Sequence, residues 1–148
     1  MKTVMDTANR NELINRIQSL QENSKREWGK MNAYQMVKHC VLCEEMYLGK
    51  RKYKRAFIGY IFGRIGLKKL LKNDTPLKIN EPTSPHFKID EPDGDFSAEK
   101  LKWISLMKEY GSYSNDDFEH WFFGKMTKEQ VGLFVYKHTD HHLRQFNC

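Results

Sequence analysis

The segment from Thr127 to Phe146 constrains the fold of this chain more than any other stretch. Thr127 followed by Gln130 is the capping-box pattern, in which each side chain bonds the other residue's backbone amide at the start of a helix. The apolar face of that predicted helix comprises Val131, Phe134 and Val135, and at the same spacing it continues as His138 and His142. Because such a face points into the protein, we predict two buried imidazoles one turn apart.

Three further segments repeat their apolar residues with the period of a helix. They cover about residues 10–21, 32–49 and 95–111. The second has a capping box of its own in Asn32 and Gln35, and the third includes Leu101 in its apolar pattern. Because amphipathic helices gain most of their stability by packing their apolar faces together, we predict an all-α fold without strands, organised as a four-helix bundle.

A long segment, residues 50–96, separates the second of these helices from the third. It starts with a basic arm, residues 50–72, which contains nine Lys and Arg and no Asp or Glu. Residues 55–71 of the arm are predicted to form an extra amphipathic helix, whereas residues 73–94 hold all four prolines and are predicted to be irregular. A crossover of this length lets the second and third helices run the same way, so we expect an up-down-down-up bundle in one domain, residues 1–148.

Composition places the chain among folded, non-exported proteins. It has 148 residues, of which 39% are hydrophobic and 30% charged, which suits one folded domain. The N-terminus has no apolar run before Asp6, so we predict no export signal and a cytoplasmic protein. Cys40, Cys43 and Cys148 cannot all pair within one chain, and we expect reduced thiols.

The two imidazoles on the last helix are the strongest indication of chemistry. A buried imidazole without partners costs about 1–3 kcal/mol, so two on one buried face favour a shared metal ion. His39, on the face of the second helix that carries Met36, is the candidate third ligand. Three neutral nitrogens leave a coordination position open, as in catalytic zinc sites. The HExxH protease motif is excluded because Thr139 follows His138, and a hydrogen-bonded histidine pair without metal is the competing interpretation.

The order of these residues resembles a known family. A single His on the second helix is followed, on the last helix, by the sequence HTDHHLRQ from His138 to Gln145. This resembles the H-x-x-H-H-R-x-Q-like signature of the DinB/YfiT-like four-helix metalloproteins, except that Arg144 is displaced by one position. The stretches WGKMNAYQMVKH, residues 28–39, and HWFFGKMTKEQ with YKHTDHHLRQF, within residues 120–146, resemble an uncharacterised branch of that superfamily.

The resemblance implies a homodimer-prone bundle with a divalent metal on His39, His138 and His142. Zn²⁺ and Ni²⁺ are the expected ions, since nitrogen ligands do not separate them. Members of known activity use the metal to activate a low-molecular-weight thiol for transfer to an electrophile, which implies an S-transferase-like enzyme with a small-molecule substrate. A metal-dependent hydrolase is the enzymatic alternative. The non-enzymatic alternative is a helical binding module that docks through residues 50–72.

Further residues are candidates for bonds to the metal ligands or for a pocket beside them. They are His141, Gln145, Cys43, His120 and Trp28. Cys40 and Cys43 form a CxxC without a second pair, which favours buried core thiols, although Cys43 lies one turn from His39. His120 starts an aromatic block that either floors a pocket above the metal or plugs the end of the bundle.

The basic arm, residues 50–72, has three interpretations. It binds nucleic acid phosphates, lies on an anionic membrane, or packs on the bundle and attracts an acidic small substrate. We expect the third, because no recognisable nucleic-acid-binding fold accompanies the charge. Nucleic acid and a membrane surface are therefore not expected partners.

Overall fold

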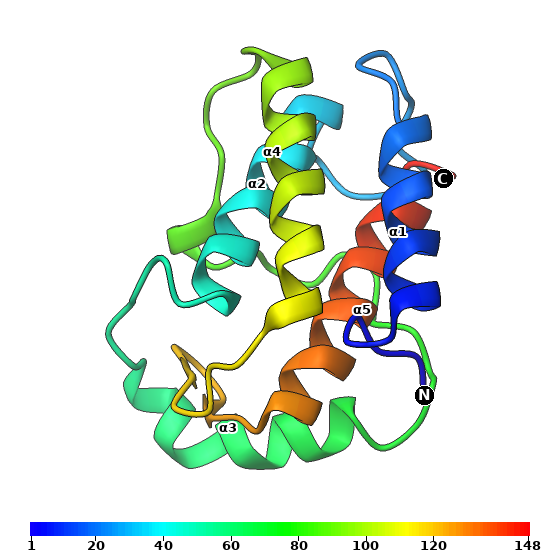
Figure 1. Cartoon of the computed structure of the whole chain (residues 1–148). Helices are drawn as coiled ribbons and strands as arrows, with labels where there is room; N and C mark the ends of the chain where they lie inside the picture. The colour runs from blue at the N-terminus through cyan, green and yellow to red at the C-terminus, as the bar shows by residue number, and fades with distance from the viewer.

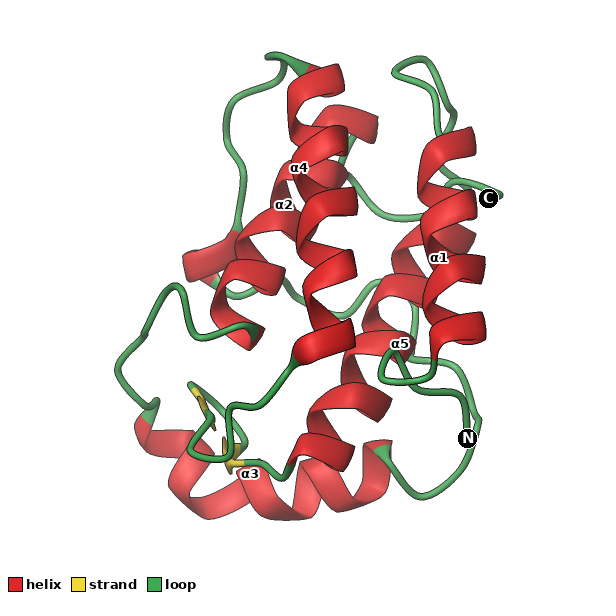
Figure 2. Ribbon diagram, viewed as in Figure 1, coloured by secondary structure: helices red, strands yellow, loops and turns green.

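The computed structural model describes the whole chain, Met1–Cys148. It is mostly helical, with five α-helices, two short 3-10 helices and one two-stranded sheet (Figure 1, Figure 2). The α-helices are α1 (Thr7–Ser19), α2 (Ala33–Tyr47), α3 (Phe57–Leu70), α4 (Phe96–Glu109) and α5 (Lys128–Gln145). The 3-10 helices are η1 (Pro85–Phe87) and η2 (Tyr110–Ser112), and the strands are β1 (Glu119–His120) and β2 (Gly124–Lys125).

Side chains cap the starts of α1, α2, α4 and α5. Both predicted capping boxes are confirmed: Asn32 and Gln35 bond each other's backbone amides, and so do Thr127 and Gln130. α1 begins earlier than the apolar period predicts, because the Asp6 carboxylate accepts a 2.9 Å hydrogen bond from the Asn9 amide.

Four of the helices pack side by side around one core. α2 packs against α4 and α5, and α1 packs against the same two helices. α2 and α4 run in one direction, and α1 and α5 run in the opposite one (Figure 1). Trp103, Tyr110 and Leu143 are among the largest side chains that this core buries completely. α3 lies across one end of the assembly and does not run alongside the other four helices (Figure 2).

Two expectations are wrong in detail. The chain is not free of strands, because β1 and β2 pair antiparallel, with Glu119 opposite Lys125 and His120 opposite Gly124. Gly124 has a φ of 76°, which a residue without Cβ adopts at no steric cost, and two-residue strands are too short to show an alternating pattern. On α4, Leu101 is 66% exposed instead of buried, because the helix turns its other side to the core.

The crossover between α2 and α4 follows the prediction in outline. α3 occupies residues 57–70, and the proline-rich part is irregular apart from η1. Phe87 in η1 and Ile89 just after it are buried, so the loop contributes a wall to the core. No helix in the chain combines the length and the apolar character that crossing a bilayer requires.

Candidate metal centre

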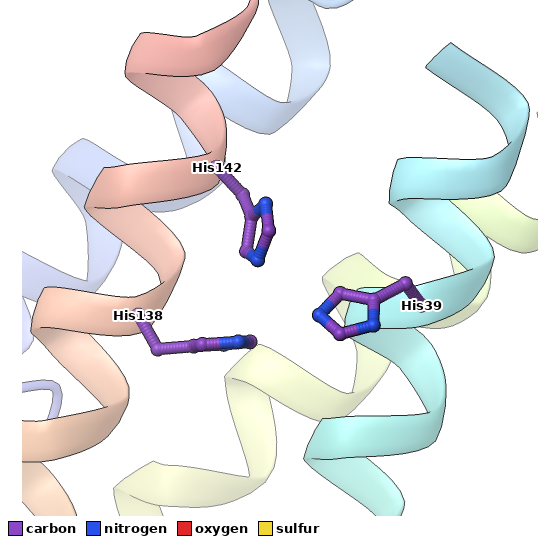
Figure 3. A group of neighbouring side chains, drawn as sticks. All are labelled: His39, His138 and His142. Atoms are coloured by element: carbon purple, nitrogen blue, oxygen red, sulfur yellow. The ribbon is translucent and has the colours of Figure 1, made fainter. Parts of the chain in front are cut away.

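α2 and α5 bring three histidines together inside the protein. His39 projects from α2, and His138 and His142 project from α5, one turn apart (Figure 3). One nitrogen of each ring lies within 4.8 Å of the corresponding nitrogens of the others. The ring centres are 5.5 Å apart for His39 and His138, and 4.7 Å apart for His138 and His142. Three histidines in this arrangement can hold a metal ion.

The His39 ring is oriented by the crossover loop. Its Nδ1 lies 2.9 Å from the backbone carbonyl oxygen of Phe87. A carbonyl can only accept, so Nδ1 carries the proton and Nε2 keeps its lone pair. A ring nitrogen that donates to a carbonyl is the usual support of a metal-binding histidine. The backbone carbonyl of the buried Phe87 therefore fixes the form of His39 that can act as a ligand.

The His142 ring is oriented by a chain of two hydrogen bonds. The side-chain amide nitrogen of Gln145 donates to the backbone carbonyl of Trp28 at 2.9 Å. This bond places the Gln145 amide oxygen 3.0 Å from Nδ1 of His142, which must then donate. His142 thus also presents an unprotonated Nε2.

His138 has no such support. Its Nδ1 is buried and has no hydrogen-bond partner. Burial lowers the pKa of His39, and burial together with the neighbouring imidazoles lowers the pKa of His138 and His142 well below its usual value. Three neutral rings, two with an unprotonated Nε2 and one with an unpartnered nitrogen, are a donor set that could hold a divalent metal ion.

A cavity of about 540 Å³ adjoins one side of the cluster. Its lining includes His142 and the neighbouring His141, Gln145 and Trp28, together with the charged side chains of Lys30 and Asp90. His39 and His138 do not line it, so His142 is the ligand that faces the cavity. A small molecule can thus approach the cluster from the His142 side.

His141 and Cys43 both lie beside the cluster, in different positions. His141 forms part of the cavity wall, with its ring centre 5.6 Å from Trp28, and its buried Nδ1 has no partner. The Cys43 sulfur lies 3.7 Å from Nε2 of His39, but it does not belong to the group of mutually close ligand atoms. Burial raises the pKa of the Cys43 thiol well above its usual value, so without a metal it stays protonated.

His120 lies away from the cavity. Its Nδ1 accepts hydrogen bonds of 3.1 and 3.2 Å from the backbone amides of Phe122 and Phe123, and its ring stacks on Phe123. Burial lowers the pKa of His120 to about 3. These contacts place His120 in the β1–β2 hairpin, where it packs on the hairpin's own aromatic residues.

Two groups beside the histidine cluster were not predicted from the sequence: the backbone carbonyl of Phe87 and the side chain of Glu44. The Phe87 carbonyl could not have been found, because backbone groups leave no signature in a sequence. Glu44 could have been: it follows Cys40 by one helical turn on the buried stripe of α2 and is fully buried. Its carboxylate accepts hydrogen bonds from Tyr110 and Thr139, and burial raises its pKa to about 7.

No curated protein and no solved structure matches this chain. One family model does match, and it spans residues 2–148, which is nearly the whole chain. The chain therefore belongs to the family described as "Protein of unknown function (DUF1569)".

Proposed function

We propose that this protein is a metal-dependent enzyme in which His39, His138 and His142 hold a divalent ion that activates a small thiol for transfer to an electrophile. The observation that carries the proposal is a set of three neutral imidazoles, two buried and one half-buried, beside a cavity. Two of them have an unprotonated Nε2, and the third has a buried nitrogen without a partner. A bound ion would give all three rings one shared partner, including His138, which has none in the protein itself.

The protein's own groups provide orientation in this proposal. The Phe87 carbonyl and Gln145 hold two of the rings in the ligating tautomer. When bound, the ion lowers the pKa of a thiol or water that enters its open position. The group of mutually close ligand atoms contains no carboxylate, and Glu44 is bonded to Tyr110 and Thr139. Because no carboxylate lies among the mutually close ligand atoms, activation of the nucleophile in this proposal falls to the ion, which favours a thiol.

The cavity favours a hydrophilic substrate. Of its fifteen lining residues only three are hydrophobic. Lys30 and Lys88 stand beside Glu81 and Asp90 in the lining, so both signs of charge are available to a polar molecule. Zn²⁺ and Ni²⁺ remain the proposed ions, and a low-molecular-weight thiol remains the proposed co-substrate.

We further propose that α1, α2, α4 and α5 form a DinB-like up-down-down-up bundle and that the protein is a homodimer. The packing of α2 and α1 against the same two helices and the shared direction of α2 and α4 support the bundle. The dimer rests on family resemblance. Light scattering on the purified protein tests it, and a monomeric mass at all concentrations contradicts it.

Metal analysis of the purified protein tests the centre. We expect about one divalent ion per chain in the wild type and almost none in His138→Ala. His86→Ala is the matched control, because His86 is exposed and lies outside the cluster. Equal metal content in the wild type and His138→Ala would contradict the site.

A cobalt-substituted sample tests the reaction class. Co²⁺ in a His₃ site is coloured, and a thiol that enters its coordination sphere adds a sulfur-to-metal charge-transfer band. We expect the band with small thiols, followed by thiol consumption when a generic electrophile is added. Hydrolysis of esters without thiol consumption would instead identify the hydrolase. A colourless, inactive protein would leave the binding-module interpretation.

A further inference from the structure

The helix α3 contacts the rest of the protein through its smallest residues. Its buried positions are Gly59, Gly63 and Leu67, which follow one another at four-residue intervals. A Cβ atom at either glycine would collide with the backbone carbonyl of Phe122 in the β1–β2 hairpin. The hairpin backbone therefore lies directly on the glycine face, and the large side chains of α3 must point elsewhere.

Those large side chains form an exposed apolar face on the outer side of α3. The face comprises Phe57, Ile58, Tyr60, Ile61, Phe62 and Ile65. All six are more than half exposed, and Phe57 reaches 81%. They make up six of the nine exposed large hydrophobic residues of the chain, so the exposure is concentrated here. A contiguous apolar patch of this kind marks an interaction site.

Unpaired positive charge surrounds this apolar face. Lys68 and Lys69 follow Ile65 by three and four residues, so they continue the same side of the helix. Lys54 lies before α3, and Lys72 lies just after it. All four lysines are exposed, and none forms a salt bridge. The stretch from Met46 to Asn73, which includes the basic arm, contains no Asp or Glu that would neutralise these lysines.

We propose that the outer face of α3 docks on an anionic lipid surface, with the helix lying in the plane of the interface. Apolar side chains that enter the acyl boundary, with lysines that reach the headgroups beside them, are what such a surface binds. α3 crosses one end of the molecule, where the other helices do not shield its outer side (Figure 1). Its fourteen residues suit a helix that lies on a bilayer, and no helix here can cross one.

Charge argues against the two competing occupants. Pairing of α3 with α3 of a second copy would bring two sets of unpaired lysines together, in a segment without carboxylates. Nucleic acid would satisfy the lysines but offers nothing for the exposed isoleucines Ile58, Ile61 and Ile65, since bases stack on aromatic rings. An anionic lipid surface matches both features at once. The sequence-based expectation that the arm packs on the bundle holds only for the glycine face.

Flotation of the full-length protein with lipid vesicles tests this proposal. We expect co-flotation with vesicles of phosphatidylcholine and phosphatidylserine, little with phosphatidylcholine alone, and weakening as salt is raised. Ile61→Glu and Ile65→Glu should each reduce partitioning about tenfold, because each places a charge at the acyl boundary. Lys68→Gln with Lys69→Gln should reduce it about 25-fold, at about fivefold for each cation.

Leu101→Glu is the matched control. Leu101 is 66% exposed on α4, so the substitution is chemically the same but lies outside the α3 face, and binding should be unchanged. All of these positions are exposed, so the variants should keep the wild-type melting temperature. Absence of vesicle binding, or equal binding to neutral vesicles, overturns the proposal. If vesicle binding is absent, two results identify the competing occupant. A concentration-dependent dimer that Ile61→Glu abolishes indicates a second copy, and single-stranded DNA binding that Lys68→Gln weakens indicates nucleic acid. Metal content does not enter this test, so its outcome is independent of the proposed enzyme.

Discussion

The interface between α2 and α5 buries two polar clusters that differ in one respect. In the carboxylate cluster, both oxygens of Glu44 accept hydrogen bonds, one from Tyr110 and one from Thr139. In the histidine cluster, His138 immediately precedes Thr139, yet its Nδ1 has no partner. A buried polar group is normally satisfied, so the unpartnered nitrogen of His138 calls for a ligand, whereas both oxygens of Glu44 are already bonded. We interpret the first as structural and the second as a binding site.

The two clusters also respond to burial in opposite directions. Burial raises the pKa of Glu44 to about 7 and lowers the pKa of His138 well below its usual value. In each case the uncharged form is favoured, because a low-dielectric interior penalises charge. A neutral imidazole is the form that binds metal, whereas a protonated carboxyl is a hydrogen-bonding group. The same physical effect therefore prepares one cluster for a cation and the other for packing.

The largest predicted effect is the stabilisation of the histidine cluster by metal. With free Zn²⁺ at about 1,000 times its dissociation constant, the free energy of unfolding of the wild type should rise by about 4 kcal/mol. His138→Ala should show almost none of this gain, whereas Glu44→Gln should show all of it. Thermal melts with and without Zn²⁺ provide the measurement. A loss of the metal response in Glu44→Gln would mean that the clusters are not separate.

The difference in pH dependence between the wild type and Glu44→Gln should come from the carboxylate cluster. The buried histidines, whose pKa values are lowered, contribute stability that is lost as pH falls, and they do so equally in both proteins. Because the folded pKa of Glu44, about 7, exceeds its usual 4.5, its contribution is fully present below pH 4.5 and is lost as pH rises to about 7. The loss is on the order of 3 kcal/mol, and Glu44→Gln should lack it. Urea titrations of both proteins between pH 5 and pH 8 provide the test. Parallel curves for the two proteins would show that Glu44 does not titrate in this range.

Loss of the Gln145 side chain, which orients His142, should weaken metal binding less than loss of a ligand histidine. Gln145→Ala removes the acceptor that orients His142 and should weaken metal binding by about 10- to 100-fold. Gln145→Glu keeps an acceptor for Nδ1 and should recover much of that affinity, although it loses the donor to Trp28. Competition with a coloured chelator measures both. Equal affinity in the wild type and Gln145→Ala would show that His142 is oriented by other contacts.

The smallest predicted effect separates adjacent residues. Thr139→Val is nearly isosteric and removes the 3.3 Å hydrogen bond to Glu44, so stability should fall by about 1 kcal/mol. Metal content should be unchanged, although Thr139 follows His138 directly. If the substitution removed metal instead, the two clusters would form one network.

Local rules account for most of what could be predicted. The capping boxes at Asn32 and Thr127 and the stripe that ends in His138 and His142 depend on neighbours a few residues away, so the sequence displays them. The prediction that Leu101 is buried is wrong because the apolar period does not fix the rotation of α4 about its axis. That rotation is decided by the helices that pack against α4. The β1–β2 pairing was not predicted because it depends on a backbone turn at Gly124 and on contact with the glycine face of α3. These two segments are far apart in the sequence.

The sequence by itself determined the existence of the helices, the two starting points with capping boxes, and the placement of two histidines one turn apart on one helix face. These properties follow from backbone hydrogen bonding and the 3.6-residue period, which act over short distances along the chain. Only the tertiary structure decided that His39 joins the other two, that the Phe87 carbonyl and Gln145 set their tautomers, and that α3 turns its large apolar residues outward. Each of these results from contacts between segments far apart in the chain, and close packing alone selects among the alternatives that local preferences leave open.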